Sequence, residues 1–207
     1  MTSRKPPAEQ RSSEAFFFAL KHMKCTELIL EDHTLLRRGL AVVDGMLQKL
    51  EDGQRIEIYD ASTILKFLRL FGDQYHQAME ESVLFPALLR AAPNNAVLRE
   101  FVTDHGHERI LMAQIEEALT AKRGMVFFRS SRELTALLRT HCNSEESILE
   151  DLAGRCLSEE QDESVHREFM KARSQVETYA DFSRLERRYV PIPDAQLKRG
   201  IAASYSR

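Results

Sequence analysis

Apolar residues recur at steps of three and four along most of this chain, the spacing of amphipathic helices. The clearest stripe lies in residues 26–50 and consists of Ile29, Leu36, Leu40, Val43 and Leu47. Similar segments are expected at 61–91, 95–122 and 128–153. No convincing strand pattern interrupts them. Four long helices joined by short links predict an all-α fold, an up-down-up-down four-helix bundle.

Glycine, proline and capping residues predict where these helices end. Gly53, Gly124 and Gly154 follow three of the apolar stripes, and glycine commonly stops a helix at its carboxyl end. Asp60 is expected to cap the second helix. Pro86 lies inside that helix and is expected to kink it.

The two ends of the chain differ from its middle. Residues 1–25 are expected to form a polar lead and a short helix, residues 26–153 the bundle, and residues 154–207 an additional C-terminal helix and tail. This helix opens with a capping-box pattern at Ser158 and carries an apolar stripe from Val165 to Tyr179. The stripe is predicted to pack on the bundle or on a second subunit, which would form a homodimer.

Composition narrows the class of protein. The 207 residues allow one domain or two small ones, and the 8 glycines and 6 prolines are too few for a turn-rich β fold. A net charge of −3 argues against a nucleic-acid-binding protein. Three widely spaced cysteines without a CxxC pattern suggest reduced thiols, and the N-terminal apolar run is too short for a signal peptide or a membrane span. A cytoplasmic protein without membrane contact is therefore expected.

Each of the four long helices places one histidine on or near its apolar face. These histidines are His33, His76, His105 and His141. A single buried histidine is usually a hydrogen-bonded core residue. Four imidazoles in one bundle core would be costly unless a shared group binds them.

Two of these histidines belong to a repeated motif. The segments that begin at His76 and at His141 both read HxxxEES followed by Val or Ile and then Leu. Residues four apart share a helix face, so Glu80 should project with His76 and Glu145 with His141. Asp32-His33 and Asp104-His105 form a weaker echo. Four imidazoles and two carboxylates predict a site for two divalent metals, but these residue types suit iron, manganese and zinc alike.

This pattern resembles the hemerythrin-like (HHE) family of di-iron four-helix bundles. The resemblance rests on Asp32-His33, on HQAMEESVLFP from His76, on Asp104-His105 and on LRTHCNSEE around His141, and it spans roughly residues 26–153. It implies two iron ions held as a non-heme di-iron centre. The ligands that it implies are His33, His76, Glu80, His105, His141 and Glu145.

Two departures from true hemerythrins stand out. Arg109 occupies the place of a further histidine, one turn after His105. Glu145 and Glu146 compete for the place of a carboxylate after His141. The set of four histidines and two glutamates is more similar to the di-iron domain of the repair-of-iron-centres proteins, although their short cysteine-bearing N-terminal domain has no counterpart in this sequence.

Three functions are compatible with these residues. The leading one is a binding protein that binds or senses dioxygen, nitric oxide, peroxide or a related oxidant. The second is an enzyme-like role, either in nitric oxide or peroxide reduction or in iron donation for the repair of iron–sulfur centres. The third is a helical interaction module that holds zinc or no metal.

Overall fold

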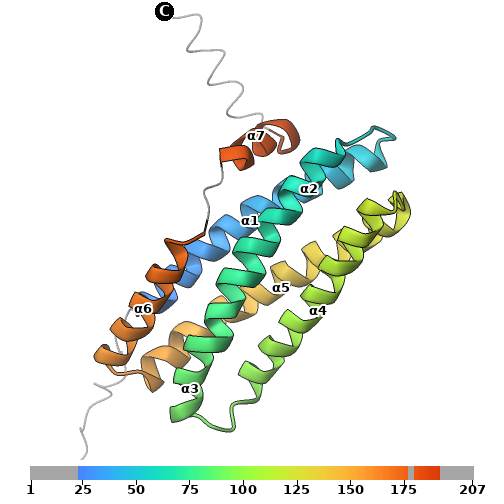
Figure 1. Ribbon diagram of the computed structural model, residues 1–207. Helices are drawn as coiled ribbons and strands as arrows, with labels where there is room; N and C mark the ends of the chain where they lie inside the picture. The colour runs from blue at the N-terminus through green and yellow to red at the C-terminus, as the bar shows by residue number, and fades with distance from the viewer. Residues whose placement is uncertain (1–22, 177–179, 192–207) are drawn as a thin grey trace, which may run out of the picture.

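The computed structural model describes residues 23–176 and 180–191, and every regular element in these ranges is helical. Long helices run antiparallel to their neighbours and form a bundle, as predicted (Figure 1). The elements, in chain order, are α1 (Lys24–Glu51), α2 (Ile58–Phe67), the π-helical segments η1 (Leu68–Gln77) and η2 (Glu80–Leu84), α3 (Phe85–Ala91), α4 (Ala96–Thr120), α5 (Gly124–Cys156), α6 (Glu159–Arg173) and α7 (Ala180–Tyr189). Segments α2 to α3 together make one arm of the bundle.

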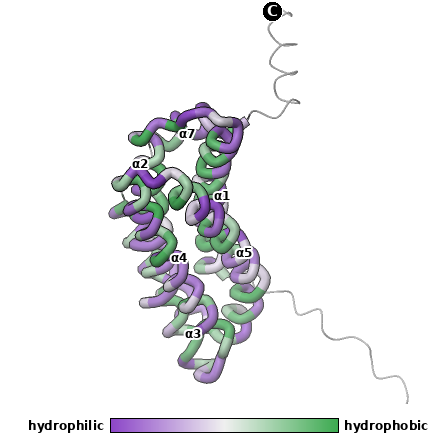
Figure 2. The backbone as a smooth tube through the Cα atoms, turned by 90° about the vertical axis from the view of Figure 1, so that its right-hand side faces the viewer, coloured by the Kyte–Doolittle hydropathy of each residue, from purple (hydrophilic) through white to green (hydrophobic). Residues whose placement is uncertain are grey.

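The bundle core is apolar at both ends and polar in the middle. One apolar cluster includes Leu40, Phe71 and Ile115, and a second includes Leu88 and Leu98 near the other end. Apolar and polar residues alternate along each helix, as Figure 2 shows by colour. The buried histidines and glutamates lie between the two clusters in every arm. The flanking apolar clusters therefore keep water away from this polar layer.

The second arm differs from the single kinked helix that the sequence predicts. Its hydrogen bonding widens to the π-helical pattern over Leu68–Gln77 and again over Glu80–Leu84. The α-helix resumes at Phe85, so Pro86 falls in its first turn, where a missing backbone N–H costs nothing. Segments of π-helix are often found at functional sites. Here the two segments carry His76 and Glu80.

Several predicted helix ends need correction. The first helix ends before Gly53, as expected, and Gly53 adopts a φ of 72°, which glycine tolerates best. Gly154, however, lies inside α5, and Gly124 begins that helix instead of ending the previous one. Asp60 is not a cap, because α2 already begins at Ile58. A helix can continue through a glycine where packing contacts stabilise the residues that follow it.

Helix α6 packs against the bundle, as one of the two predicted arrangements requires. The capping box of Ser158 and Gln161 is present, and Val165 and Phe169 are buried. Asp162 accepts hydrogen bonds from the backbone N–H groups of Lys24 and Cys25, both at 3.0 Å, and so caps α1.

Helix α7 is a second C-terminal helix that the sequence does not predict. It contacts α1 and α2, where the buried carboxylate of Asp60 accepts hydrogen bonds from Arg184, Arg188 and Tyr189 at 2.7–2.8 Å. Gly45 lets the chain pass closely, because a Cβ there would lie 1.9 Å from the Tyr189 carbonyl oxygen.

Parts of the predicted terminal segments lie outside the described residues. These parts are residues 1–22, residues 177–179, which include Tyr179 at the end of the predicted stripe, and residues 192–207. None of the described helices combines the length and hydropathy needed to cross a bilayer.

Candidate metal centre

The six predicted ligands lie together in the polar middle layer. Each arm supplies one histidine, from α1, η1, α4 and α5, and the two glutamates come from η2 and α5. All six are buried, with at most 2% of their surface exposed. These side chains are His33, His76, Glu80, His105, His141 and Glu145. Their role as ligands stays a prediction, which their geometry supports.

Two overlapping groups of four side chains offer atoms that could hold metal ions. One group contains His33 and His76, the other His105 and His141, and both contain Glu80 and Glu145. Within each group the ligating atoms lie within 4.8 Å of one another. Each half of the chain thus contributes its own histidine pair, and the two glutamates lie between the pairs.

Contacts of the two glutamates fit a bridging position. Glu80 directs Oε1 to within 3.5 Å of His76 Nε2 and Oε2 to within 3.5 Å of His105 Nε2. Glu145 Oε2 lies 3.2 Å from Nε2 of both His33 and His141. Each carboxylate therefore faces both histidine pairs.

The buried polar atoms at the centre fit a bound cation. His105 Nε2 and His141 Nε2 are 2.9 Å apart, which suits two bonds of about 2.1 Å to one ion at an angle near 90°. The carboxylate oxygens of Glu80 and Glu145 have no hydrogen-bond partner that satisfies good geometry among the described residues. Buried carboxylates are costly unless paired or bound to metal. A pair of divalent cations would satisfy these atoms together.

Charges in the metal-free centre are unevenly distributed. Burial and the nearby Glu145 raise the pKa of Glu80 well above its usual value. Burial opposes ionisation of Glu145 too, but the close imidazoles of His141 and His33, both 3.2 Å away, outweigh it and lower the pKa of Glu145. Burial lowers the pKa of His105 to about 4, whereas Glu145 raises that of His141 to about 9 against the effect of burial. Metal binding would therefore release protons, notably from Glu80 and His141.

A ring of acidic residues surrounds the four imidazoles. Every Nε2 faces the centre and every Nδ1 faces outward to a carboxylate. His33 Nδ1 lies 3.0 Å from Glu146, and His105 Nδ1 lies 2.8 Å from Glu81. The other two contacts are longer: 3.6 Å from His76 Nδ1 to Asp32 and 3.5 Å from His141 Nδ1 to Asp104. Such contacts fix the ring orientation and the tautomer of a ligating histidine.

This outer ring repeats the internal symmetry of the sequence. Asp32 and Asp104 each contact the second histidine of their own half. Glu81 and Glu146 instead contact the first histidine of the opposite half. The doubled glutamates of HxxxEE therefore divide two tasks, one facing the centre and one orienting a histidine. The paired EE letters were a visible signal for this division, but they do not reveal which histidine each glutamate reaches.

Two arginines complete the repeat. Arg37 follows His33 by four residues and donates to Glu146 at 2.5 Å, while Arg109 follows His105 by four and donates to Glu81 at 2.8 Å. Arg109 also donates to Asp73 at 2.6 Å. The sequence therefore contains the pattern DHxxxR twice, which extends the shorter Asp-His repeat by one arginine. Arg109 thus contacts Glu81, which in turn contacts His105.

The family assignment agrees with this geometry. The sequence model of the hemerythrin HHE cation-binding domain matches residues 25–153, well over half of the chain. The chain belongs to the hemerythrin HHE cation-binding family. Comparisons with curated proteins and with solved structures give no match. All six predicted ligands fall within the matched HHE range.

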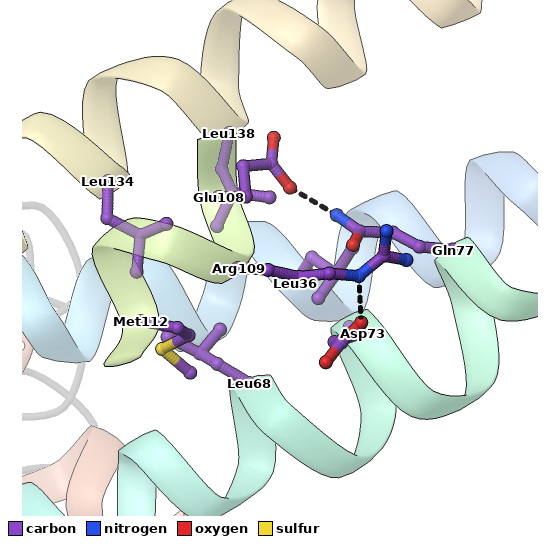
Figure 3. Close-up of a pocket in the computed structure, with 10 residues that line it drawn as sticks. Leu36, Leu68, Asp73, Gln77, Glu108, Arg109, Met112, Leu134 and Leu138 are labelled. Atoms are coloured by element: carbon purple, nitrogen blue, oxygen red, sulfur yellow. Dashed lines mark hydrogen bonds and ion pairs between the residues drawn. The ribbon is translucent and has the colours of Figure 1, made fainter. Parts of the chain in front are cut away.

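A small cavity lies one helical turn from the centre of this HHE domain. It is lined by residues of α1, η1, α4 and α5, and Figure 3 shows Glu108 and Gln77 on its polar side. Arg109 and Asp73 form an ion pair at the same side. Burial raises the pKa of Glu108 to about 7, even though His141 and Gln77 act in the opposite direction. Sequence analysis did not identify Glu108 or Gln77, because neither belongs to the repeat.

Proposed function

We propose that this protein is a non-heme di-iron protein of hemerythrin type that binds or senses dioxygen, nitric oxide or a related oxidant. The observation that carries the proposal is the pair of four-residue groups that share Glu80 and Glu145. Two histidines with carboxylates at each position, and coordination places left over, favour iron among the metals that imidazole and carboxylate accept. When bound, the two ions would supply electrons and open positions for a small ligand.

The residues of the chain would support that chemistry in distinct ways. His33 and His76 would hold one ion, His105 and His141 the other, and Glu80 and Glu145 would bridge them. Glu81 and Glu146 orient two of the imidazoles and hold a proton on the Nδ1 atoms. The apolar clusters on either side exclude water. A dry site strengthens the binding of a polarised small ligand.

Iron quantification with optical spectra tests this proposal. The protein, purified without oxygen, should hold two irons per chain and give distinct spectra in the reduced, oxidised and azide-treated states. On exposure to air the reduced form should oxidise within minutes, without a long-lived oxygenated form, because Arg109 provides no nitrogen ligand. A chain that holds one metal, or only zinc, would contradict the di-iron proposal. An oxygenated form that is stable for hours and reversible under vacuum would instead indicate a storage protein.

One observation supports the enzyme-like alternative. The donor set of four histidines and two glutamates is similar to that of the repair-of-iron-centres proteins. Turnover of nitric oxide or peroxide, or transfer of iron to an apo iron–sulfur protein, would favour it over binding alone.

Cytoplasmic location remains a prediction from the unpaired cysteines. A homodimer through the C-terminal helix also remains a prediction, and the apolar face of α6 is already covered within the chain by the bundle.

A further inference from the structure

The cavity beside the centre has an apolar wall and a polar one. Leu36, Met112 and Leu134 belong to the apolar wall, and Gln77 and Glu108 belong to the polar wall (Figure 3). The space open to the centre of a water molecule is about 20 Å³. This space holds one small molecule of the size of water or dioxygen. None of the six predicted ligands lines it, yet Gln77 directly follows His76 and Glu108 lies one turn after His105.

Glu108 and Gln77 form a buried pair with unused hydrogen-bonding capacity. Each is only 3% exposed, and the Gln77 amide donates a hydrogen bond to Glu108 Oε2. Glu108 Oε1 and Gln77 Oε1 have no hydrogen-bond partner among the described residues. A buried polar atom is normally satisfied by protein, water or ligand. These two oxygens are therefore available to a molecule in the cavity.

Among the residues that the structure describes, no lysine or arginine forms an ion pair with Glu108. The guanidinium of Arg109, which also lines the cavity, donates instead to Asp73 and Glu81. The other charged groups that act on Glu108 are His141, Glu145 and Asp104. Two of these three are carboxylates, and they oppose its ionisation. A buried carboxyl without a cationic partner favours the neutral, protonated form, which can donate an O–H group.

From this arrangement we propose that Glu108 donates a proton to a small oxygen-containing ligand that lies between the cavity and the metal centre. In this step the O–H bond of the Glu108 carboxyl breaks and an O–H bond forms on the ligand, while no electron moves at Glu108. The Gln77 amide stabilises the carboxylate that remains. Asp73 and Arg109 line the same cavity and are partly exposed to solvent, so water can replace the proton from that side.

The inference rests on the proposed di-iron function, and its first test uses the iron-loaded protein. Dioxygen is mixed with the reduced protein across a range of pH, in H₂O and in D₂O. Glu108→Gln should oxidise at least ~10-fold more slowly than wild type, and it should lose the pH dependence and solvent isotope effect that wild type shows. Glu108→Asp should restore part of the pH dependence. Glu100→Gln, an exposed carboxylate on the same helix, is the matched control and should behave as wild type.

Two outcomes of this first test would overturn the inference. One is a Glu108→Gln variant that keeps the wild-type rate, pH profile and isotope effect. The other is a Glu108→Gln variant that loses iron, because Glu108 would then hold metal or support the fold instead of donating a proton.

A second test separates the inference from the di-iron proposal. In zinc-loaded protein the histidines hold a metal that has no redox chemistry. Infrared spectra of this protein detect the carbonyl band of a protonated carboxylic acid. Wild type should show such a band that disappears as the pH is raised, and Glu108→Gln should lack it whereas Glu100→Gln keeps it. Identical titrations in wild type and Glu108→Gln would overturn the role of Glu108 even if iron is bound. A protein without iron but with this band would contradict only the proposed function.

Discussion

At the scale of single residues, the two glutamates of each HxxxEE motif have different surroundings. Glu145 is fully buried and touches two histidines on the central side, whereas Glu146 is partly exposed and touches one histidine from outside. Glu146 is further held by Arg37. The same carboxylate chemistry therefore gives a bridging position in one case and an orienting position in the other.

Removing one charge from each glutamate should separate these roles. Glu145→Gln is expected to abolish binding of the metal pair, because a neutral amide cannot bridge two cations. Glu146→Gln should retain two metals per chain with ~10-fold lower affinity, the usual cost of disturbing an orienting contact. Metal analysis and competition with a chelator measure both effects. Equal loss of metal in the two variants would show that the division of roles is wrong.

Arg109 supports the centre from outside, in the same manner as Arg37. Arg109→Ala should free Glu81 and lower the metal affinity of the His105–His141 position by ~10-fold, with the helical content unchanged. Arg69→Ala is the control, because Arg69 pairs with Asp73 and Glu116 but touches no histidine. Chelator titration should show a weaker second metal only in Arg109→Ala. If both variants release metal as wild type does, Arg109 has no positioning role.

At the scale of helices, distant segments supply contacts that the local sequence lacks. Helix α1 has no capping side chain of its own, and Asp162 of α6 caps it from 137 or more residues away. Helix α7 is short and has few apolar residues, and Asp60 of α2 holds it through three side chains. These contacts join sites far apart in sequence, which explains why local patterns did not predict them.

The contribution of the Asp162 cap to stability can be measured by comparison with the adjacent residue Glu163. Asp162→Ala should lower the free energy of unfolding by ~1–2 kcal/mol, because two backbone N–H groups at the start of α1 lose their acceptor. Glu163→Ala removes only an exposed ion pair with Lys24 and should leave the free energy of unfolding nearly unchanged, because solvent screens such a pair. Urea denaturation of both variants gives the comparison. Equal effects would mean that the cap contributes nothing beyond surface charge.

The contacts of Asp60 should make the docking of α7 depend on pH. Burial raises the pKa of Asp60, but hydrogen bonds from Tyr189 and Arg184 outweigh it and hold the pKa below its usual value. Its ionised form therefore stabilises the fold above the unfolded-state pKa of about 4, and this contribution is lost as the pH falls through the lower folded-state pKa.

Asp60→Asn should accordingly cost ~2 kcal/mol at pH 7, and the difference from wild type should shrink below about pH 4. Denaturation curves at several pH values measure this difference. Asp52→Asn, at the exposed end of α1, is the control and should differ little from wild type at any pH. A difference that stays constant down to pH 3 would exclude the charge of Asp60 as its cause.

At the scale of the whole molecule, α6 completes one end of the bundle. Phe169 is fully buried and Val165 nearly so, both within the apolar cluster that includes Leu28 of α1.

We propose the division of the chain into residues 1–25, 26–153 and 154–207 as a description of its sequence units. The structure indicates that the last two units share one core.

Truncation after Leu157 should therefore destabilise the protein. It removes α6 and α7, uncovers the apolar surface beneath Phe169 and takes away the Asp162 cap. We expect aggregation or a melting temperature lower by more than ~5 °C, measured by circular dichroism and size-exclusion chromatography. A truncated chain that stays monomeric with unchanged melting would show that α6 is dispensable for the bundle.

Local periodicity was sufficient to predict the four long helical arms of the bundle and the four histidines and two glutamates at its centre. A 3.6-residue repeat fixes which side chains share a face, so His76 with Glu80 and His141 with Glu145 could be paired from their spacing alone. The doubled motif also predicted two equivalent halves. These features depend on contacts within one helix, which the sequence encodes directly.

Only the tertiary structure decided how the helices combine around that layer. Which histidine each outer carboxylate reaches, the pairing of Arg109 with Glu81, the buried Glu108 beside its cavity and the capping of α1 by Asp162 all depend on contacts between helices. The widened π-helical turns and the continuation of α5 through Gly154 depend on packing as well. Packing between distant segments can outweigh local preferences of about 1 kcal/mol, such as that of glycine for a helix end, and for this reason such features cannot be read from spacing.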